Sequence, residues 1–119
     1  MYGAQVCIVN EQGEDSRASD TGEIMVRSPM MMEGYWNDTA LTRKVMRDGW
    51  VRTGDLGRFD EDGYLWFMGR KKDVIVRGGS NVSPLEVEFA LSDHPAVAES
   101  CVIGVPDAEW GQVVHACVV

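Results

Sequence analysis

The sequence predicts an α+β fold, in which a β-rich first portion is followed by a smaller portion of mixed type. Two observations predict it. Short segments of alternating apolar and polar residues, separated by glycine-containing turns, fill most of residues 1–69. Beyond them, a strand pattern leads into a helix start and then into two more apolar strands.

The first portion is expected to hold five strands and one helix. The predicted strands are "AQVCIVN", "GEIMVRSP", "GWVRTG", "LGRFDEDG" and "YLWFMG", broken by glycine turns, with "DEDG" as the tip of a hairpin. Residues 38–47 are expected to form a short amphipathic helix with apolar positions at Leu41, Val45 and Met46. Asn37 or Asp38 would be its N-cap and Gly49 the stop signal.

The second portion is expected to contain a strand, a helix and two further strands, in that order along the chain. "DVIVRGG" is the first strand. Ser83, Pro84 and Glu86 then form a helix start, because serine can cap, proline suits the first position and glutamate can reach back. The helix should run to about Ser92, ahead of strands "VAESCVIGVP" and "VVHACVV". The sequence ends inside this last apolar pattern, which suggests a piece of a longer chain, since termini are usually polar.

Composition and charge exclude several classes of protein. Hydrophobic residues make up 45% and charged residues 25%, the balance of a folded domain. A net charge of −8 and a pI near 4.6 would repel a phosphate backbone, so nucleic acid is not an expected partner. No apolar run reaches the roughly 18 residues of a membrane span, and the N-terminus lacks a signal peptide pattern. The expected location is therefore cytoplasmic.

The cysteines and histidines predict no metal site. Cys7, Cys101 and Cys117 are odd in number, widely spaced and set in apolar runs, so buried thiols are expected in place of a disulfide framework. His94, before a proline, and His115, inside a strand pattern, are expected to be structural.

Asp55 is the first candidate site residue. It lies in "WVRTGDLG", next to Gly54, where the backbone is free to turn sharply and can direct both carboxylate oxygens outward. A carboxylate only accepts hydrogen bonds, and its two oxygens match a pair of neighbouring hydroxyls such as those of a ribose. The alternative is a polar turn residue that bonds local amides.

Arg70 and a glycine pair are the next candidates. Arg70 follows the apolar strand "YLWFM", where a rigid element can direct its guanidinium toward an acceptor; the alternative is a surface ion pair. Gly78 and Gly79 can let a thin ligand pass close to the backbone, or can simply form a turn.

Four ordered motifs resemble one enzyme family. "GEIMVRSPMMMEGYW", "WVRTGDLG", "GYLWFMGRKKDVIVRGGSNVSPLEVE" and "HPAVAESCVIGVPDAEWG" together resemble the adenylate-forming superfamily of acyl- and aryl-CoA synthetases, peptide adenylation domains and luciferases. The resemblance spans essentially the whole chain. Peptide adenylation domains tend to have D-x-Q-V-K-I-R-G after the arginine, whereas "KKDVIVRGG" is similar to the CoA-ligase version.

The resemblance implies a domain division. Residues 1–71 would be the end of the large N-terminal domain, a β-rich distorted barrel. Residues 72–119 would be the hinge and the start of the small α+β C-terminal domain. The family activates a carboxylic acid with Mg²⁺-ATP to an acyl-adenylate, and then transfers the acyl group to the thiol of CoA.

The resemblance also implies residue roles. Asp55 would hold the ribose hydroxyls of ATP or AMP, Arg70 would contact the same sugar and Phe67 would pack on it. Lys72 would be the hinge between the domains. Gly78 and Gly79 would lie along the pantetheine arm of CoA.

The same resemblance implies what this chain lacks. The phosphate-binding loop and the acyl pocket of the family would precede residue 1, and the lysine used in adenylation would follow residue 119. The sequence therefore predicts no catalytic residue and no metal ligand in this chain, and no enzymatic activity of the chain alone. Because the acyl pocket would precede residue 1, the sequence does not indicate which carboxylic acid is activated. Strands cut from their neighbours also predict a homodimer or a strand swap.

Two other functions remain open from the sequence. One is a non-catalytic nucleotide-binding or interaction module. The other is an adenylating enzyme whose acceptor is a carrier protein.

Overall fold

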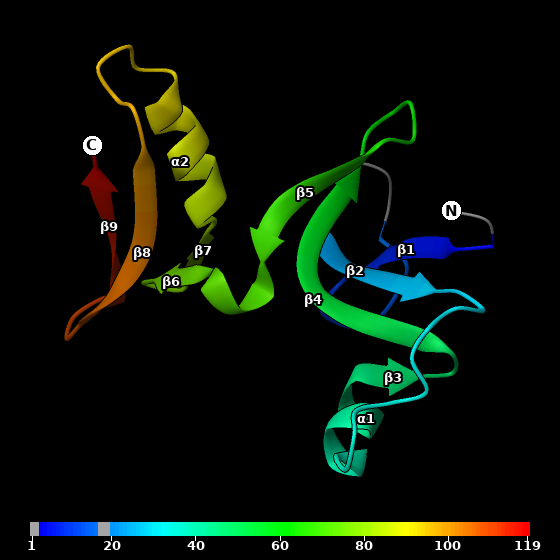
Figure 1. Cartoon of the computed structure of the whole chain (residues 1–119). Helices are drawn as coiled ribbons and strands as arrows, with labels where there is room; N and C mark the ends of the chain where they lie inside the picture. Colours follow the sequence, from blue (N-terminus) through cyan, green and yellow to red (C-terminus); the bar gives the residue numbers. More distant parts are fainter. Residues whose placement is uncertain (1–2, 17–19) are drawn as a thin grey trace. The chain divides into compact units, whose positions relative to one another are not determined.

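The computed structural model describes residues 3–16 and 20–119. The chain divides into two compact units, Met1–Phe67 and Met68–Val119. Among these residues, antiparallel sheets dominate both units, and each unit contains one α-helix (Figure 1). This arrangement confirms the predicted α+β class with a β-rich first portion.

The sheet of the first unit has the strand order β1–β2–β4–β3, with β5 paired to β4. Its strands are β1 (Gln5–Val9), β2 (Gly22–Arg27), β3 (Met46–Arg47), β4 (Trp50–Phe59) and β5 (Leu65–Arg70). β1 and β2 pair without interruption from Gln5↔Arg27 to Val9↔Glu23. Ile8, Ile24 and Val51 are buried and form the small core of this unit.

β4 is one long, curved strand (Figure 1). The expectation of two strands broken at Gly54 was wrong. Gly54 has a φ of +74°, but it lies in a bulge within the strand, where Glu23 pairs with Leu56 and Met25 pairs with Arg52. Three residues of β4 therefore face Ile24 of β2, and a bulge of this kind bends a strand without ending it.

The turn after β4 follows the sequence prediction. Asp60–Gly63 is the tip of the β4–β5 hairpin, with the Gly63 N–H donating to the Asp60 carbonyl at 3.0 Å. The Asp60 carboxylate accepts hydrogen bonds from the Tyr64 N–H at 2.8 Å and from the Trp66 indole N–H at 2.7 Å. These bonds lower the pKa of Asp60, the Trp66 bond most of all.

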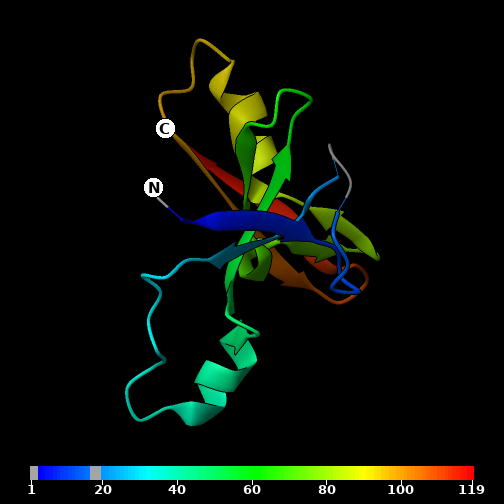
Figure 2. The same ribbon diagram turned by 90° about the vertical axis from the view of Figure 1, so that its right-hand side faces the viewer.

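Helix α1 (Thr39–Val45) lies at the end of β4 remote from this hairpin (Figure 2). Asp38 is its N-cap as predicted, with its Oδ1 accepting the Leu41 N–H at 2.8 Å. The prediction for Gly49 was wrong: the helix ends at Val45, and Asp48 and Gly49 form the two-residue turn between β3 and β4. Both have positive φ, as a type I′ hairpin turn requires.

The second unit has a four-stranded sheet of order β7–β6–β9–β8. Its elements are η1 (Lys71–Asp73), β6 (Ile75–Arg77), β7 (Ser80–Val82), α2 (Pro84–Ser92), β8 (Ser100–Asp107) and β9 (Gly111–Val118). The strand β7 was missed by sequence reasoning, because Gly78 and Gly79 reverse the chain into a second short strand. Ile75 and Val102, 2% and 4% exposed, form the core.

Helix α2 starts at Pro84 and ends at Ser92, as predicted. The predicted serine cap was wrong in its chemistry. Ser83 occupies the N-cap position, but it makes no side-chain cap bond and its hydroxyl donates to the Met68 carbonyl at 3.1 Å. The Glu88 carboxylate of this helix accepts the Val102 N–H at 2.8 Å and so ties α2 to β8.

The prediction of buried thiols was also wrong. Cys7 is partly exposed, and Cys101 and Cys117 are exposed. The alternation of a strand explains the difference: Val102 occupies the covered face of β8, and the cysteine beside it in sequence must face the other way.

Candidate functional site

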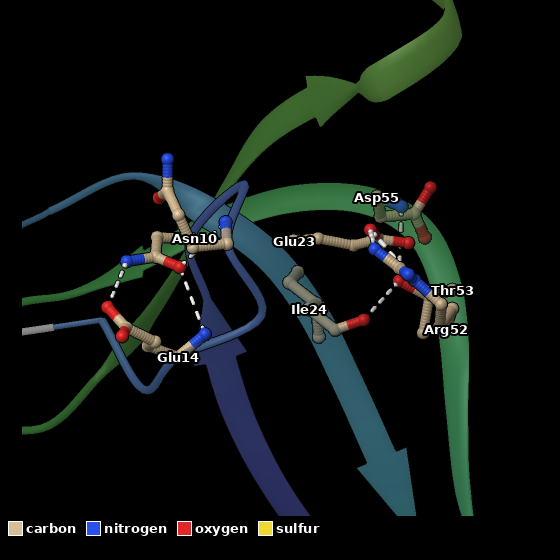
Figure 3. Close-up of polar contacts among 8 residues, drawn as sticks. Asn10, Glu14, Glu23, Ile24, Arg52, Thr53 and Asp55 are labelled. Carbon is tan, nitrogen blue, oxygen red and sulfur yellow. Dashed lines mark hydrogen bonds and ion pairs between the residues drawn. The ribbon is translucent and has the colours of Figure 1, made fainter. Parts of the chain in front are cut away.

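The bulge in β4 presents the first candidate residue, Asp55. The Thr53 hydroxyl donates to the Ile24 carbonyl at 2.8 Å and accepts the Asp55 N–H at 3.1 Å. One side chain thus fixes the bulge on both sides of Gly54 (Figure 3). Asp55 is half-buried and lies at the bulge, where the strand bends.

A charged pair lies beside the bulge and was missed by sequence reasoning. Glu23 on β2 is 6% exposed, and its Oε2 accepts bonds from Nη2 and Nε of Arg52 at 2.6 and 3.2 Å (Figure 3). The bond to Glu23 raises the pKa of Arg52. The residue types alone do not reveal this pair, because 29 positions separate them in the sequence. The pair joins β2 to β4 next to Asp55.

Phe67 and its neighbours on β5 are exposed. The exposed fractions of Leu65, Trp66 and Phe67 are 42%, 56% and 52%. Because Phe67 has a large accessible ring at the end of the first unit, it can pack on a flat ligand.

Arg70 is the last residue of β5 and the N-cap residue of η1, with φ −106° and ψ 140°. Lys72 is the central residue of that single 3₁₀ turn and is exposed. The second compact unit begins at Met68, so both residues lie within its first five positions.

Gly78 and Gly79 form the two-residue turn between β6 and β7, where Arg77 pairs with Ser80. Their φ angles are +56° and +85°, so the turn itself requires glycine. A Cβ on Gly79 would meet nothing within 4 Å, whereas a Cβ on Gly78 would lie 2.7 Å from the Trp110 ring. One glycine therefore faces open space and the other is covered by an aromatic side chain.

Trp110 was not among the sequence-predicted candidates. Its carbonyl accepts the Gly78 N–H at 2.9 Å, and the guanidinium of Arg77 lies 4.5 Å from the centre of its ring. Asp107 holds the residue in place, since its Oδ1 accepts the Trp110 N–H at 2.8 Å. The cation–π contact with Arg77 and the close approach of Gly78 hold the ring beside the hairpin.

The remaining candidates have simpler surroundings. The Nδ1 of His94 accepts the Ala96 N–H at 3.2 Å, which agrees with a structural role, and His115 is exposed on β9. Across residues 3–16 and 20–119, no three histidine, cysteine or acidic side chains are grouped so as to hold a metal ion. Over the same residues, the helices are too short and too polar to cross a membrane.

The chain is similar to known proteins in sequence and in fold. Residues 86–119 match the family of AMP-binding enzyme C-terminal domains. The chain is 49% identical over 112 residues to an indoleacetate–CoA ligase of Aromatoleum aromaticum, covering 94% of this chain and 22% of the relative. It is 49% identical over 109 residues to a long-chain-fatty-acid–CoA ligase of Bacillus subtilis, covering 92% of this chain and 20% of that protein.

A solved structure extends the likeness to the fold. ATP-bound MatB from Rhodopseudomonas palustris superposes with a TM-score of 0.93 at 42% identity, covering 98% of this chain and 24% of that one. The chain therefore belongs to the adenylate-forming superfamily. These two curated relatives are CoA ligases, and the chain spans about a fifth of their length.

Proposed function

We propose that this chain is the part of an AMP-forming acid–thiol ligase that holds the nucleotide sugar and carries the hinge and the start of the pantetheine channel. The observation that carries the proposal is the 49% identity to CoA ligases over more than nine-tenths of the chain. A match of that extent includes both the β4 bulge and the glycine hairpin.

The reaction of the complete enzyme would have two halves. An oxygen of the carboxylic acid attacks the α-phosphorus of Mg²⁺-ATP, pyrophosphate leaves, and an acyl-adenylate forms. The sulfur of CoA then attacks the acyl carbonyl carbon, and AMP leaves with the electron pair of the broken C–O bond. Both halves use the same bound AMP group, so a residue that fixes its sugar serves each of them.

Asp55 suits the sugar contact because the bulge holds its backbone. An ionised carboxylate can accept one hydrogen bond from each of two adjacent hydroxyls. The Thr53 hydroxyl fixes the Asp55 N–H, and the Glu23–Arg52 pair supports the strand on the adjacent face. A rigid carboxylate loses little conformational entropy when the nucleotide binds.

Arg70 and Phe67 complete the proposed sugar contacts. Phe67 offers an exposed ring and Arg70 a planar donor at the end of β5. Lys72 is proposed as the hinge, with residues 1–71 on the large-domain side and 72–119 on the small-domain side. Its place in a single exposed 3₁₀ turn supports this, since the hydrogen bonds of a 3₁₀ turn have poorer geometry than those of an α-helix.

The glycine hairpin is proposed to lie along the pantetheine arm. A Cβ on Gly79 would have no neighbour within 4 Å, so an extended thiol arm can approach its backbone. The Trp110 ring, held next to Gly78, provides a flat apolar surface beside the same turn.

The test is a chimera. The matching segment of the Bacillus subtilis long-chain-fatty-acid–CoA ligase is replaced by this chain, so that the host supplies the other four-fifths of the enzyme. We expect ATP-dependent acyl-CoA formation by the chimera and none by the chain alone. Asp55→Asn in the chimera should reduce kcat/KM for ATP by about 10- to 100-fold, because a charged hydrogen bond is worth about 1.5–3 kcal/mol.

Asp62→Asn is the matched control, because it makes the same change in an exposed turn. Equal activity of the Asp55 and Asp62 variants would overturn the sugar contact. A folded chimera that releases pyrophosphate but passes the acyl group only to an amine or a carrier protein would overturn CoA as the acceptor. A folded chimera with neither half-reaction would favour a non-catalytic module.

A further inference from the structure

Cys101 and Cys117 lie directly opposite each other on β8 and β9. Direct cross-strand partners in an antiparallel pair project from the same face of the sheet. Both cysteines are exposed, whereas Val102, the next residue along β8, is 4% exposed on the covered face. The two thiols therefore share the open face of the β8–β9 ribbon.

The hydrogen bonds around the pair define its geometry. Glu99 and Val119, two residues from the cysteines and just outside β8 and β9, exchange backbone hydrogen bonds at 2.9 and 3.4 Å. The Val102 N–H points away from β9 and donates to Glu88 at 2.8 Å. Because bonded and non-bonded pairs alternate along an antiparallel ladder, Cys101 and Cys117 form a bonded pair, with Cα atoms about 5.5 Å apart.

That spacing allows a disulfide, but not a relaxed one. Disulfides occur with Cα atoms about 4.4–6.8 Å apart, which includes this pair. Their Cβ atoms, however, are about 3.5–4.5 Å apart, whereas opposed residues in a bonded pair have Cβ atoms nearer to 5.5 Å. The strands must close slightly to form the bond, and such a disulfide is more easily reduced than an unstrained one.

We propose that Cys101 and Cys117 are a redox-responsive dithiol, which a low-molecular-mass disulfide such as oxidised glutathione converts reversibly to a cross-strand disulfide. One protein thiolate attacks a sulfur of oxidised glutathione, and a glutathione thiolate leaves. The second protein thiolate then attacks the protein sulfur of this mixed disulfide and expels the second glutathione. The chain loses two electrons and two protons, and the reagent gains both.

This dithiol lies away from the glycine hairpin and Trp110 within the same compact unit. Asp107, where the β8–β9 turn begins, lies six positions beyond Cys101 on β8, a length of about 20 Å along a strand. The turn that holds Trp110 and the end that holds the cysteines are opposite ends of the ribbon (Figure 1). The inference therefore does not depend on the proposed ligase function.

The test uses the full chain with Cys7→Ser, which leaves two thiols. The protein is treated with oxidised glutathione, quenched with N-ethylmaleimide and examined by intact mass and peptide mapping. We expect a main species that has lost two hydrogen atoms, carries neither glutathione nor maleimide, and contains a 101–117 cross-link. An excess of reduced glutathione should restore two thiols that react with maleimide.

A register control shows whether the fold brings the thiols together. Cys117→Ser combined with Ala116→Cys keeps two cysteines but moves one to the opposite face of β9. In native buffer this control should cross-link at least about tenfold more slowly than the Cys7→Ser chain, and in urea the two should react alike. Circular dichroism confirms that both chains are folded.

Three outcomes would overturn the proposal. The first is a folded Cys7→Ser chain that retains two glutathiones or two free thiols. The second is equal cross-linking of the register control in native buffer. The third is a 101–117 bond that survives a large excess of reduced glutathione, because it would then be a structural disulfide.

Discussion

A single hydroxyl, that of Thr53, connects the backbone of Asp55 to the neighbouring strand. It donates to Ile24 and accepts from Asp55, and it spans a glycine whose φ of +74° other residues rarely adopt. The sequence-based expectation for the backbone at Asp55 was wrong, since "TGD" suggests a turn and forms a bulge. Whether glycine makes a turn or a bulge depends on the partner strand, which local sequence does not specify.

Arg52 is expected to stabilise the bulge through Glu23. Arg52→Leu removes two hydrogen bonds to a carboxylate that is 6% exposed. Because the Arg52 side chain is 42% exposed, solvent screens part of the interaction, and we expect a loss of about 1–2 kcal/mol of unfolding free energy. Urea denaturation measures the change.

Arg47→Leu is the matched control for this prediction. Arg47 lies 3.6 Å from Asp48 in an ion pair whose side chains are 89% and 87% exposed. Its loss should change the unfolding free energy by less than about 0.5 kcal/mol. Equal effects of the two substitutions would show that the Glu23–Arg52 pair has no special role.

Asp60 gives a pH-dependent prediction. The Trp66 indole bond, and after it the Tyr64 backbone bond, lower the pKa of the folded state below the ordinary value of 3.8. A lowered pKa means that the carboxylate stabilises the fold above pH 3.8 and that this contribution is lost as pH falls through the folded pKa. The difference in urea midpoint between the wild type and Asp60→Asn should therefore be largest near neutral pH and shrink below pH 3.8.

The same titration with Asp62→Asn provides the comparison in the same turn. The urea midpoint of Asp62→Asn should stay close to that of the wild type, because the Asp60 carboxylate, and not that of Asp62, accepts the Trp66 and Tyr64 hydrogen bonds. A difference for Asp60→Asn that grows on acidification would contradict the assigned sign.

At the scale of elements, sequence patterns located strands and helices better than they located reversals. Alternating residues marked β1, β2, β8 and β9, and Ser83–Pro84 marked the start of α2. The strand β7 was missed because three residues are too few to show a period, and because a Gly-Gly pair can end a strand or begin a hairpin. Long-range pairing decides between these outcomes.

The glycine hairpin allows a prediction about one half-reaction. In the chimera, Gly79→Ala should slow acyl transfer to CoA while leaving pyrophosphate release near its original rate, because the added methyl group narrows the path beside the turn. The residue has a φ of +85°, so the substitution also adds backbone strain of about 1 kcal/mol. Single-turnover assays of pyrophosphate release and of acyl-CoA formation measure the two rates separately.

Gly13→Ala separates strain from function. Gly13 has a φ of +81° and, like Gly79, has nothing within 4 Å of a built Cβ. Both substitutions should lower stability to a similar degree, but only Gly79→Ala should affect the thiol step. An equal slowing of both half-reactions by the two variants would assign the effect to strain alone.

At the scale of the whole chain, the α+β class was predictable, because strand and helix periods follow from burial on one face. The contacts that define the candidate site were less so. The pairing of Arg52 with Glu23 and the packing of Trp110 on Gly78 join residues 29 and 32 positions apart. Such contacts depend on strand register, which composition and spacing leave open.

Self-association is the last prediction and concerns the chain as a whole. β5 pairs with β4, and within the described residues no other strand is hydrogen-bonded to its remaining edge. Leu65 and Phe67 on this strand are 42% and 52% exposed, so an apolar edge is available to a second copy.

Sedimentation velocity should therefore show an apparent mass that rises with protein concentration. Leu65→Lys should suppress that rise, because a charged residue on an edge strand opposes pairing. Trp36→Lys should not, although Trp36 is 91% exposed, because it lies in a loop outside the strands. A monomer at all concentrations, or equal suppression by both substitutions, would exclude β5 as the associating edge.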